Sequence, residues 1–226
     1  MNFEVRSLAG LTPFREVHAL QKQLLEQRIR DEIPDTLIFC EHTPVITRGR
    51  GLQAKPGRTE RSTPLVHLSP GTDYEEIERG GDLTWHGPGQ LVLYPILKLG
   101  GDGVIGKAIG QDVDRYIRFL ENTWIDVLKD FDLHAGTRPH GSGVWLGERK
   151  LASVGIALRR WVSYHGVAMN VINDLAPFKA FDPCGFQSEV MTRLQDLPGV
   201  SIEFFGQNWR QLWENQIIDS LQKKFV

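Results

Sequence analysis

Residues 79–97 read RGGDLTWHGPGQ followed by LVLYPIL. The first part holds five glycines or prolines in twelve residues. Because these residues favour turns and close backbone approach, we expect a loop there rather than a strand or a helix. The second part is an apolar run that predicts a buried strand, and Pro95 indicates an edge or a bend in it. The loop is typical of a segment that wraps a ligand, with backbone amides as donors and Trp85 as an apolar wall. A tight connection into the strand would have the same composition.

Two common nucleotide-binding loops are excluded for this segment. A phosphate-binding loop would continue into Gly-Lys-Ser/Thr, and that sequence is missing. The dinucleotide fingerprint opens a helix, whereas this loop leads into a predicted strand. The glycines alone therefore do not identify the ligand.

The flanking sequence alternates between helical and strand patterns. It predicts helices at about 14–31, at about 105–131 and from about 208, and strands at 36–40, at 91–97 and several times within 144–171. Thr12 and Pro13 indicate the start of the first helix, as an N-cap and a first-turn proline. No linker or internal repeat stands out. We therefore expect one α/β (α+β) domain over residues 1–226, with mixed sheet pairing.

The composition is that of an ordinary globular protein. The 226 residues are 41% hydrophobic and 24% charged, with a formal net charge of -2. This balance argues against a dedicated nucleic-acid binder, because such proteins carry a basic excess. No apolar run approaches the roughly 20 residues of a membrane-spanning helix, and we expect no signal peptide. Two cysteines cannot form a disulfide scaffold, so we expect a cytoplasmic protein.

The two cysteines stand in different settings. Cys40 lies in the apolar run TLIFC, which indicates a buried thiol acting as a small hydrophobe. Cys184 lies between Pro183 and Gly185, in a turn that would hold the sulfur exposed, although a loop thiol without a role has the same setting. A nucleophilic cysteine needs its thiolate, which a nearby cation stabilises. Lys150 is a candidate for that cation, or an ordinary solvated lysine.

Each of three further stretches has both a purely structural and a functional interpretation. Small residues at 153–155 and 165–168 would let a ligand chain lie against the backbone, and His165 is equally a satisfied histidine at the start of a strand. Residues 48–61 contain Arg48, Arg50, Lys55, Arg58 and Arg61 against Glu60, a local charge of +4. This basic stretch is either a solvated loop or a docking surface for an acidic partner.

Five motifs, in order along the chain, resemble those of the lipoyl(octanoyl) transferases. They are EHTPV at 41–45, RGGDLTWHGPGQLVLYPI at 79–96, KLASVG at 150–155, HGVAMN at 165–170 and PCG at 183–185. Leu83 and Trp85 replace a valine and a tyrosine that are usual in the family, and Arg193 stands where a serine is often seen. None of these departures removes a catalytic group.

The resemblance implies a fold and a reaction. The fold is a mixed-sheet catalytic domain of the biotin/lipoate protein ligase type. The reaction transfers octanoyl from octanoyl-acyl carrier protein to the target lysine of lipoyl domains, through a cysteine thioester, and it begins protein lipoylation. The acceptors are the lipoyl domains of 2-oxoacid dehydrogenases and the glycine cleavage H protein. Because the donor arrives activated, we expect no ATP, metal or other cofactor.

The resemblance also implies roles for individual residues. The nucleophile is Cys184, and Lys150 lowers the pKa of its thiol by stabilising the thiolate. A thiolate cleaves a thioester to give a second thioester of similar energy, so the acyl group stays reactive. The substrate-binding residues are Arg79, Gly80, Gly81, Asp82, Leu83, Thr84, Trp85, His86, Ser153, Val154, Gly155, Gly166, Val167 and Ala168.

Three alternatives stay open at this point. An ATP-dependent lipoate-protein ligase would have the same fold but would not need Cys184. A non-catalytic module that binds acyl chains or lipoyl domains would not need to keep both Cys184 and Lys150. A biotin ligase is disfavoured because its glycine- and arginine-rich loop is reduced to the fragment at residues 49–51.

Overall fold

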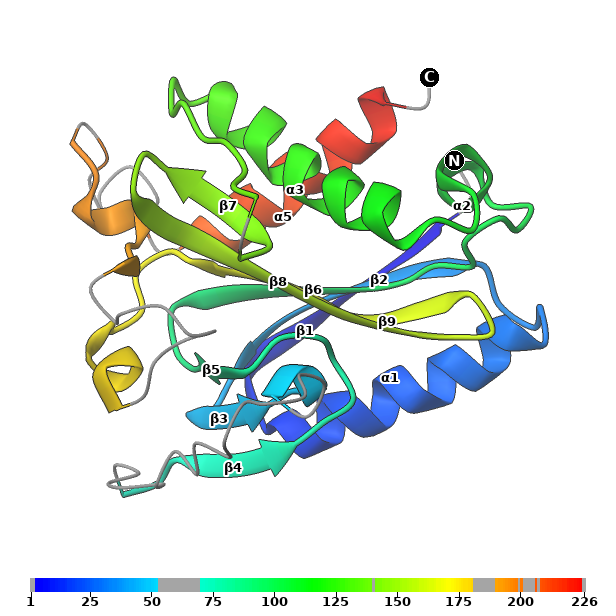
Figure 1. Cartoon of the computed structure of the whole chain (residues 1–226), viewed down its shortest axis with the longest axis horizontal. Coiled ribbons are helices and arrows are strands. Elements are labelled where there is room, and N and C mark those ends of the chain that lie inside the picture. Colours follow the sequence, from blue (N-terminus) through cyan, green and yellow to red (C-terminus); the bar gives the residue numbers. More distant parts are fainter. Residues whose placement is uncertain are drawn as a thin grey trace.

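A six-stranded mixed sheet forms the centre of the molecule (Figure 1). The computed structural model describes residues 3–52, 70–139, 141–180, 190–198, 200, 206 and 208–224. The strand order is β1 (Phe3–Thr12), β2 (Asp35–His42), β6 (Gln90–Ile96), β9 (Val162–Asn170), β8 (Arg149–Arg159) and β7 (Gly143–Leu146). Strands β1 and β2 pair in parallel, and every other neighbouring pair is antiparallel. The mixed sheet expected from the sequence is confirmed.

Helix α1 (Phe14–Ile29) covers one face of this sheet (Figure 1). The layer between them contains Phe14, Val17, Leu24 and Leu25 of the helix with Ile38, Val92 and Tyr94 of the strands. The three-and-four spacing of these helical residues places them on one side, which is why the sequence predicted the helix. The predicted cap is wrong: Thr12 ends β1, and Pro13 occupies the N-cap without a side-chain hydrogen bond.

Three helices cover the opposite face: α2 (Val104–Ile109), α3 (Val113–Lys129) and α5 (Trp209–Lys223) (Figure 1). The core on this side contains Tyr116, Leu120, Trp124, Trp213 and Ile217 of the helices with Leu93, Val144 and Leu151 of the sheet. The single helix expected at 105–131 is two helices. Gly110 ends α2 at a φ of 73°, and the Asp112 side chain caps α3 by accepting from the Arg115 amide at 2.9 Å. In the ranges given above, no helix is both long and apolar enough to span a bilayer.

A second sheet lies on the same side of the main sheet as α1 (Figure 1). Its strands are β4 (Asp73–Glu76), β3 (Val45–Arg48) and β5 (Leu83–His86), in that order. The sequence predicted a loop over residues 79–90, and this prediction is wrong for residues 83–86, which form β5. Its partner β3 lies far back in the chain, so local composition did not reveal the pairing.

Pro95 lies in β6 in the middle of the main sheet, so the predicted edge position is wrong. Strand β6 pairs with β9 only from Gln90 to Leu93. Beyond that point, the Ser163 hydroxyl donates to the Pro95 carbonyl at 2.8 Å. The proline therefore stands where the ladder to β9 has already ended, and its missing N–H costs no hydrogen bond to β9.

Candidate active site

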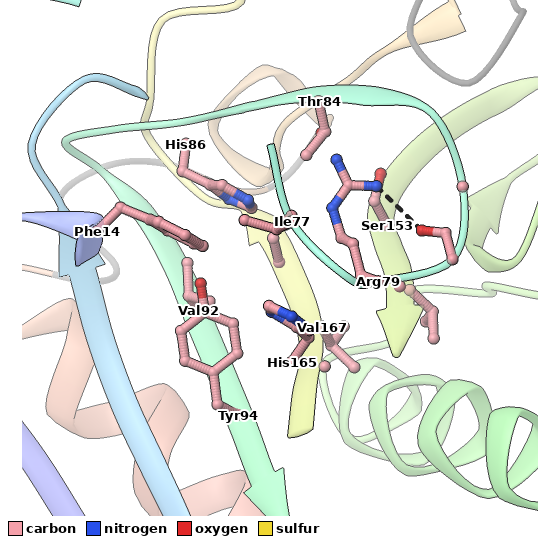
Figure 2. A pocket seen from close by; sticks show the side chains of 16 residues that line it. Phe14, Ile77, Arg79, Thr84, His86, Val92, Tyr94, Ser153, His165 and Val167 are labelled. Atoms are coloured by element: carbon pink, nitrogen blue, oxygen red, sulfur yellow. Dashed lines mark hydrogen bonds between the residues drawn. The ribbon is translucent and has the colours of Figure 1, made fainter. Parts of the chain in front are cut away.

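A cavity lies between the main sheet and the segment that joins β4 to β5 (Figure 2). It has an empty volume of about 460 Å³, which includes space open to solvent. The lining residues are Phe14, Ile77, Arg79, Gly80, Gly81, Thr84, His86, Val92, Tyr94, Ser153, Val154, Gly155, His165, Gly166, Val167 and Ala168. They come from α1, β5, β6, β8, β9 and the 77–81 segment, so the cavity depends on contacts between distant parts of the chain.

The structure brings together the three segments that the sequence predicted as substrate-binding. All the predicted binding residues except Asp82, Leu83 and Trp85 line the cavity. Successive side chains of a strand point to opposite faces, so Thr84 and His86 of β5 face the cavity while Leu83 and Trp85 face away. Trp85 packs against Phe178 instead, with ring centroids 5.8 Å apart. It is therefore not the cavity wall that the sequence suggested.

The loop at Arg79 is fixed from two sides. The Arg79 guanidinium donates to the carbonyl of Thr47 at 2.7 Å and to its hydroxyl at 3.0 Å. The Gly80 amide donates to the Ile156 carbonyl at 2.9 Å, next to Gly155 of β8. A Cβ on Gly155 would lie 3.1 Å from Cδ of Arg79. The small residue predicted to lie against a ligand therefore also lets this loop approach β8.

His86 is a neutral imidazole at the cavity wall. Its Nδ1 atom lies 2.7 Å from Oε1 of Gln90, and the residue is buried. Burial lowers the pKa of His86 well below its usual range, and the nearby His42 lowers it further. The polar edge that His86 presents to the cavity is therefore uncharged at neutral pH.

A buried hydrogen-bond network leads from His86 through Asn170 to Thr192 and Lys150. Gln90 donates to Oδ1 of Asn170 at 2.9 Å. Asn170 donates in turn to the Thr192 carbonyl at 3.0 Å. The Thr192 amide then donates to the Lys150 carbonyl, also at 3.0 Å. Residues of three sequence motifs are thus joined, through Thr192, in one chain of contacts.

Lys150 is buried at the start of β8, with 2% of its surface exposed. Its Nζ atom lies 5.5 Å from the ring centroid of Trp145, within the range of a cation–π contact. The backbone of Lys150 forms a bridge with Met191. The predicted nucleophile Cys184 lies outside the described residues. Cys40 is fully buried, as expected, and burial raises the pKa of its thiol far above the usual range.

Sequence reasoning did not assign Phe14, Ile77, Val92 or Tyr94 to the site, although all four line the cavity. Val92 and Tyr94 alternate along β6, and that alternation was the available signal. Phe14 gave no such signal, because it reaches the cavity from the first turn of α1. His165 was singled out without a role, and it lines the cavity too.

Two other expectations have partial outcomes. Of the basic stretch, Arg48 forms an ion pair with Glu76 at 3.6 Å and Arg50 is exposed. Lys55, Arg58 and Arg61 lie outside the described residues. Arg193, which departs from the family pattern, pairs with Asp196 at 3.0 Å and donates to the Asn173 carbonyl at 2.8 Å.

Comparison with known structures identifies the fold. The chain is 17% identical to an archaeal bi-partite lipoate protein ligase from Thermoplasma acidophilum, with a TM-score of 0.62 over 98% of this chain and 83% of that one. It is also 17% identical to a lipoate-protein ligase A bound with ATP, with a TM-score of 0.62 over 97% of this chain and 85% of the other. Residues 13–212 match the family described as the lipoyl protein ligase A/B catalytic domain. The chain therefore has the fold of these ligases and belongs to the lipoyl protein ligase A/B catalytic-domain family.

Sequence relatives narrow this class to one family. An octanoyltransferase of Geobacter metallireducens is 41% identical over 190 residues, 84% of this chain and 81% of that protein. An octanoyltransferase of Gloeobacter violaceus is 42% identical over 197 residues, 86% of this chain and 81% of that protein. The chain belongs to the octanoyltransferase family and is an acyltransferase, as its motifs predicted.

Proposed function

We propose that this protein transfers an octanoyl group from octanoyl-acyl carrier protein to the target lysine of a lipoyl domain, through a thioester on Cys184. The observation that carries the proposal is the cavity, because the 79–86, 153–155 and 166–168 segments line it together. Membership in the octanoyltransferase family supports the acyl group and, with it, lipoyl proteins as acceptors. The acceptors are lipoyl domains of 2-oxoacid dehydrogenases and the glycine cleavage H protein.

The lining of the cavity suits an acyl chain with a polar end. Ile77, Val92 and Val167 supply apolar surface, and Gly155 and Gly166 let the chain lie close to the backbone. Apolar walls with a few placed polar groups are the usual composition of a small-ligand site. The neutral His86 adds a polar contact without a charge that would oppose a hydrocarbon. We infer that the hydrocarbon occupies this space and that the thioester carbonyl faces its open end.

Lys150 acts in this proposal as the cation that stabilises the Cys184 thiolate. Its burial supports the role, because a charge interacts more strongly where water is excluded. The thiolate attacks the carbonyl carbon of the donor thioester and expels the thiolate of the carrier. The amine of the acceptor lysine then attacks the enzyme thioester, expels the Cys184 thiolate and gives up a proton as the amide forms. The amide is more stable than the thioester, which drives the transfer forward.

The alternative activity is that of an ATP-dependent ligase, since structures of that class share this fold. Those structures are too distant in sequence to argue for more than the fold, whereas the octanoyltransferase relatives are about 40% identical. Two reactions separate the activities. We expect a lipoyl domain to gain octanoyl from octanoyl-acyl carrier protein without ATP, and to gain nothing from free octanoate with ATP. The reverse result would contradict the proposal.

A further inference from the structure

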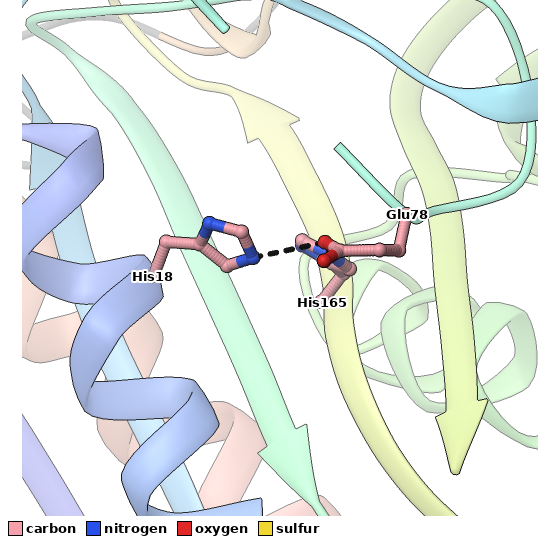
Figure 3. A group of neighbouring side chains, drawn as sticks. All are labelled: His18, Glu78 and His165. Carbon is pink, nitrogen blue, oxygen red and sulfur yellow. Dashed lines mark hydrogen bonds and ion pairs between the residues drawn. The ribbon is translucent and has the colours of Figure 1, made fainter. Parts of the chain in front are cut away.

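We propose that His18, Glu78 and His165 form a binding site for one divalent metal ion, with zinc as the best match. The three side chains come from α1, from the segment after β4 and from β9, and they point toward one another (Figure 3). Oε2 of Glu78 lies 3.1 Å from Nε2 of His18 and 3.8 Å from Nε2 of His165. One ligand atom of each residue lies within 4.8 Å of the others.

These separations are close to those of a tetrahedral zinc site. Bonds of about 2.0–2.1 Å to nitrogen and oxygen place neighbouring ligand atoms roughly 3.3 Å apart. The two distances from Oε2 of Glu78 to the histidine nitrogens, 3.1 and 3.8 Å, lie on either side of that value. His18 has 15% of its side chain exposed and Glu78 has 26%, so both can adjust around an ion. Shifts of about 1 Å would complete three ligand positions, with water in the fourth.

The second observation is the ring of His165. Only 2% of its side chain is exposed. Its Nε2 atom has no hydrogen-bond partner among the described residues and points toward Glu78. A buried polar atom without a partner is rare and costly in a folded protein. A metal ion bonded to this nitrogen would remove that cost.

The charges around the site also suit a metal ion. Burial lowers the pKa of His165 to about 3 and holds the pKa of His18 below its usual range. Both imidazoles are therefore neutral at pH 7 and can offer a lone pair. Burial opposes ionisation of the Glu78 carboxyl, but hydrogen bonds from Lys22 and from the backbone hold its pKa below the usual range. The site thus supplies two nitrogens and a carboxylate oxygen, a donor set that zinc accepts.

Among the described residues, Lys22 and Arg79 place positive charge near this cluster. Nζ of Lys22 lies 3.0 Å from Oε1 of Glu78, whereas the nearest atoms of the two histidines are paired with Oε2. The Lys22 side chain is 50% exposed, so it can move into solvent when an ion binds. His165 also lines the acyl cavity, so an ion would fix one wall of that cavity.

Zinc titration of the chelator-treated full-length chain tests the proposal, with the heat of binding as the first readout. The visible absorption of bound cobalt(II) is the second, because it reports a tetrahedral site. We expect one equivalent of either ion. His18→Ala and Glu78→Gln should each weaken binding by at least about tenfold, since loss of even an outer partner of a metal ligand costs about 10–100-fold. His134→Ala is the matched control, because His134 pairs with Asp132 on the surface.

The remaining outcomes also decide the question. The Cys184→Ser variant should still bind one metal ion per chain. Loss of metal binding in that variant would assign the metal to the thiol instead. Circular dichroism of each variant shows whether it has folded. His165→Ala should also weaken metal binding. If this variant does not fold, the metal affinities of His18→Ala and Glu78→Gln still test the proposal. Equal zinc affinity in wild type and both of those variants would overturn the proposal and leave an ordinary hydrogen-bonded His–Glu cluster.

Discussion

The side-chain amide of Gln90 donates to Oδ1 of Asn170 over 2.9 Å, between residues that stand directly opposite each other in β6 and β9. Gln90 also holds Nδ1 of His86 at 2.7 Å, while Asn170 donates to the carbonyl of Thr192 at 3.0 Å. All four residues are buried. The pair therefore joins the cavity wall to the segment that packs beside Lys150.

Replacing Asn170 by Ala should destabilise the fold. The change removes the hydrogen bonds of Asn170 with the Gln90 amide, the Asn173 amide and the Thr192 carbonyl, and a buried group that loses its partner costs about 1–3 kcal/mol. Urea denaturation measures the free energy of unfolding. Asn215→Ala is the control, because Asn215 bonds Gln211 on an exposed helix face and should change the value by less than about 0.5 kcal/mol. Equal values for the two variants would contradict the role of the network.

Much of the main fold could be predicted from the sequence. Helix α3 has apolar residues at three-and-four spacing along its whole length, and β8 and β9 are long apolar runs around a short turn. Such patterns involve residues close together in the chain, so they can be recognised in a single sequence. The small sheet was missed because its strands have four residues each and find their partners far away in the chain. The acidic sequence DYEE of β4 has little intrinsic preference for a strand.

The residues of the site, like the elements of the fold, could be predicted only in part. Sequence motifs predicted the three segments that line the cavity, because ordered motifs carry family information that composition does not. The error at Leu83 and Trp85 followed from interpreting β5 as a loop, since only a strand turns alternate side chains away from the cavity. Phe14 could not be predicted, because its place depends on how α1 packs over β6.

Alanine substitutions at three glycines should destabilise the fold to different extents. A Cβ on Gly166 would lie 2.2 Å from the Leu93 carbonyl oxygen, so Gly166→Ala should destabilise the fold by about 3 kcal/mol or more. Gly155→Ala meets Cδ of Arg79 at 3.1 Å and the Gly80 carbonyl oxygen at 3.2 Å, so these neighbours must shift by a few tenths of an ångström, and it should cost about 1 kcal/mol. Gly136 has nothing within 4 Å of such a Cβ, and Gly136→Ala should be neutral. Thermal unfolding of the three variants gives the order, and a Gly155 variant less stable than the Gly166 variant would refute it.

Stability should fall in mild acid because of His42. Burial lowers the pKa of His42 to about 4, while the unfolded chain has a value near 6.5. Between these values the unfolded state binds the extra proton, so the contribution is intact above pH 6.5 and is lost as the pH falls to about 4. The difference amounts to about 3 kcal/mol. His42→Gln should remove that share of the pH dependence of unfolding, whereas His134→Gln should not. Parallel pH profiles for wild type and His42→Gln would disprove the assignment.

Lys150→Met should raise the pKa of the Cys184 thiol. The change removes the buried cation but keeps an apolar side chain against Trp145. Loss of a cation beside a thiolate costs on the order of one to a few pKa units, each worth about 1.4 kcal/mol. The rate of thiol alkylation against pH measures the midpoint, and exposed Lys107→Met is the control. An unchanged midpoint in Lys150→Met would mean that the lysine acts elsewhere, for example on the acyl carbonyl.

The most direct test of the proposed mechanism is the intact mass of the chain after mixing with octanoyl-acyl carrier protein. We expect the wild-type chain to gain one octanoyl group and to lose it when a lipoyl domain is added. Cys40→Ser should still gain the group, because Cys40 is buried in β2 and its thiol stays protonated. Cys184→Ser should gain nothing and transfer nothing. Octanoyl transfer by Cys184→Ser at the wild-type rate would contradict the thioester mechanism.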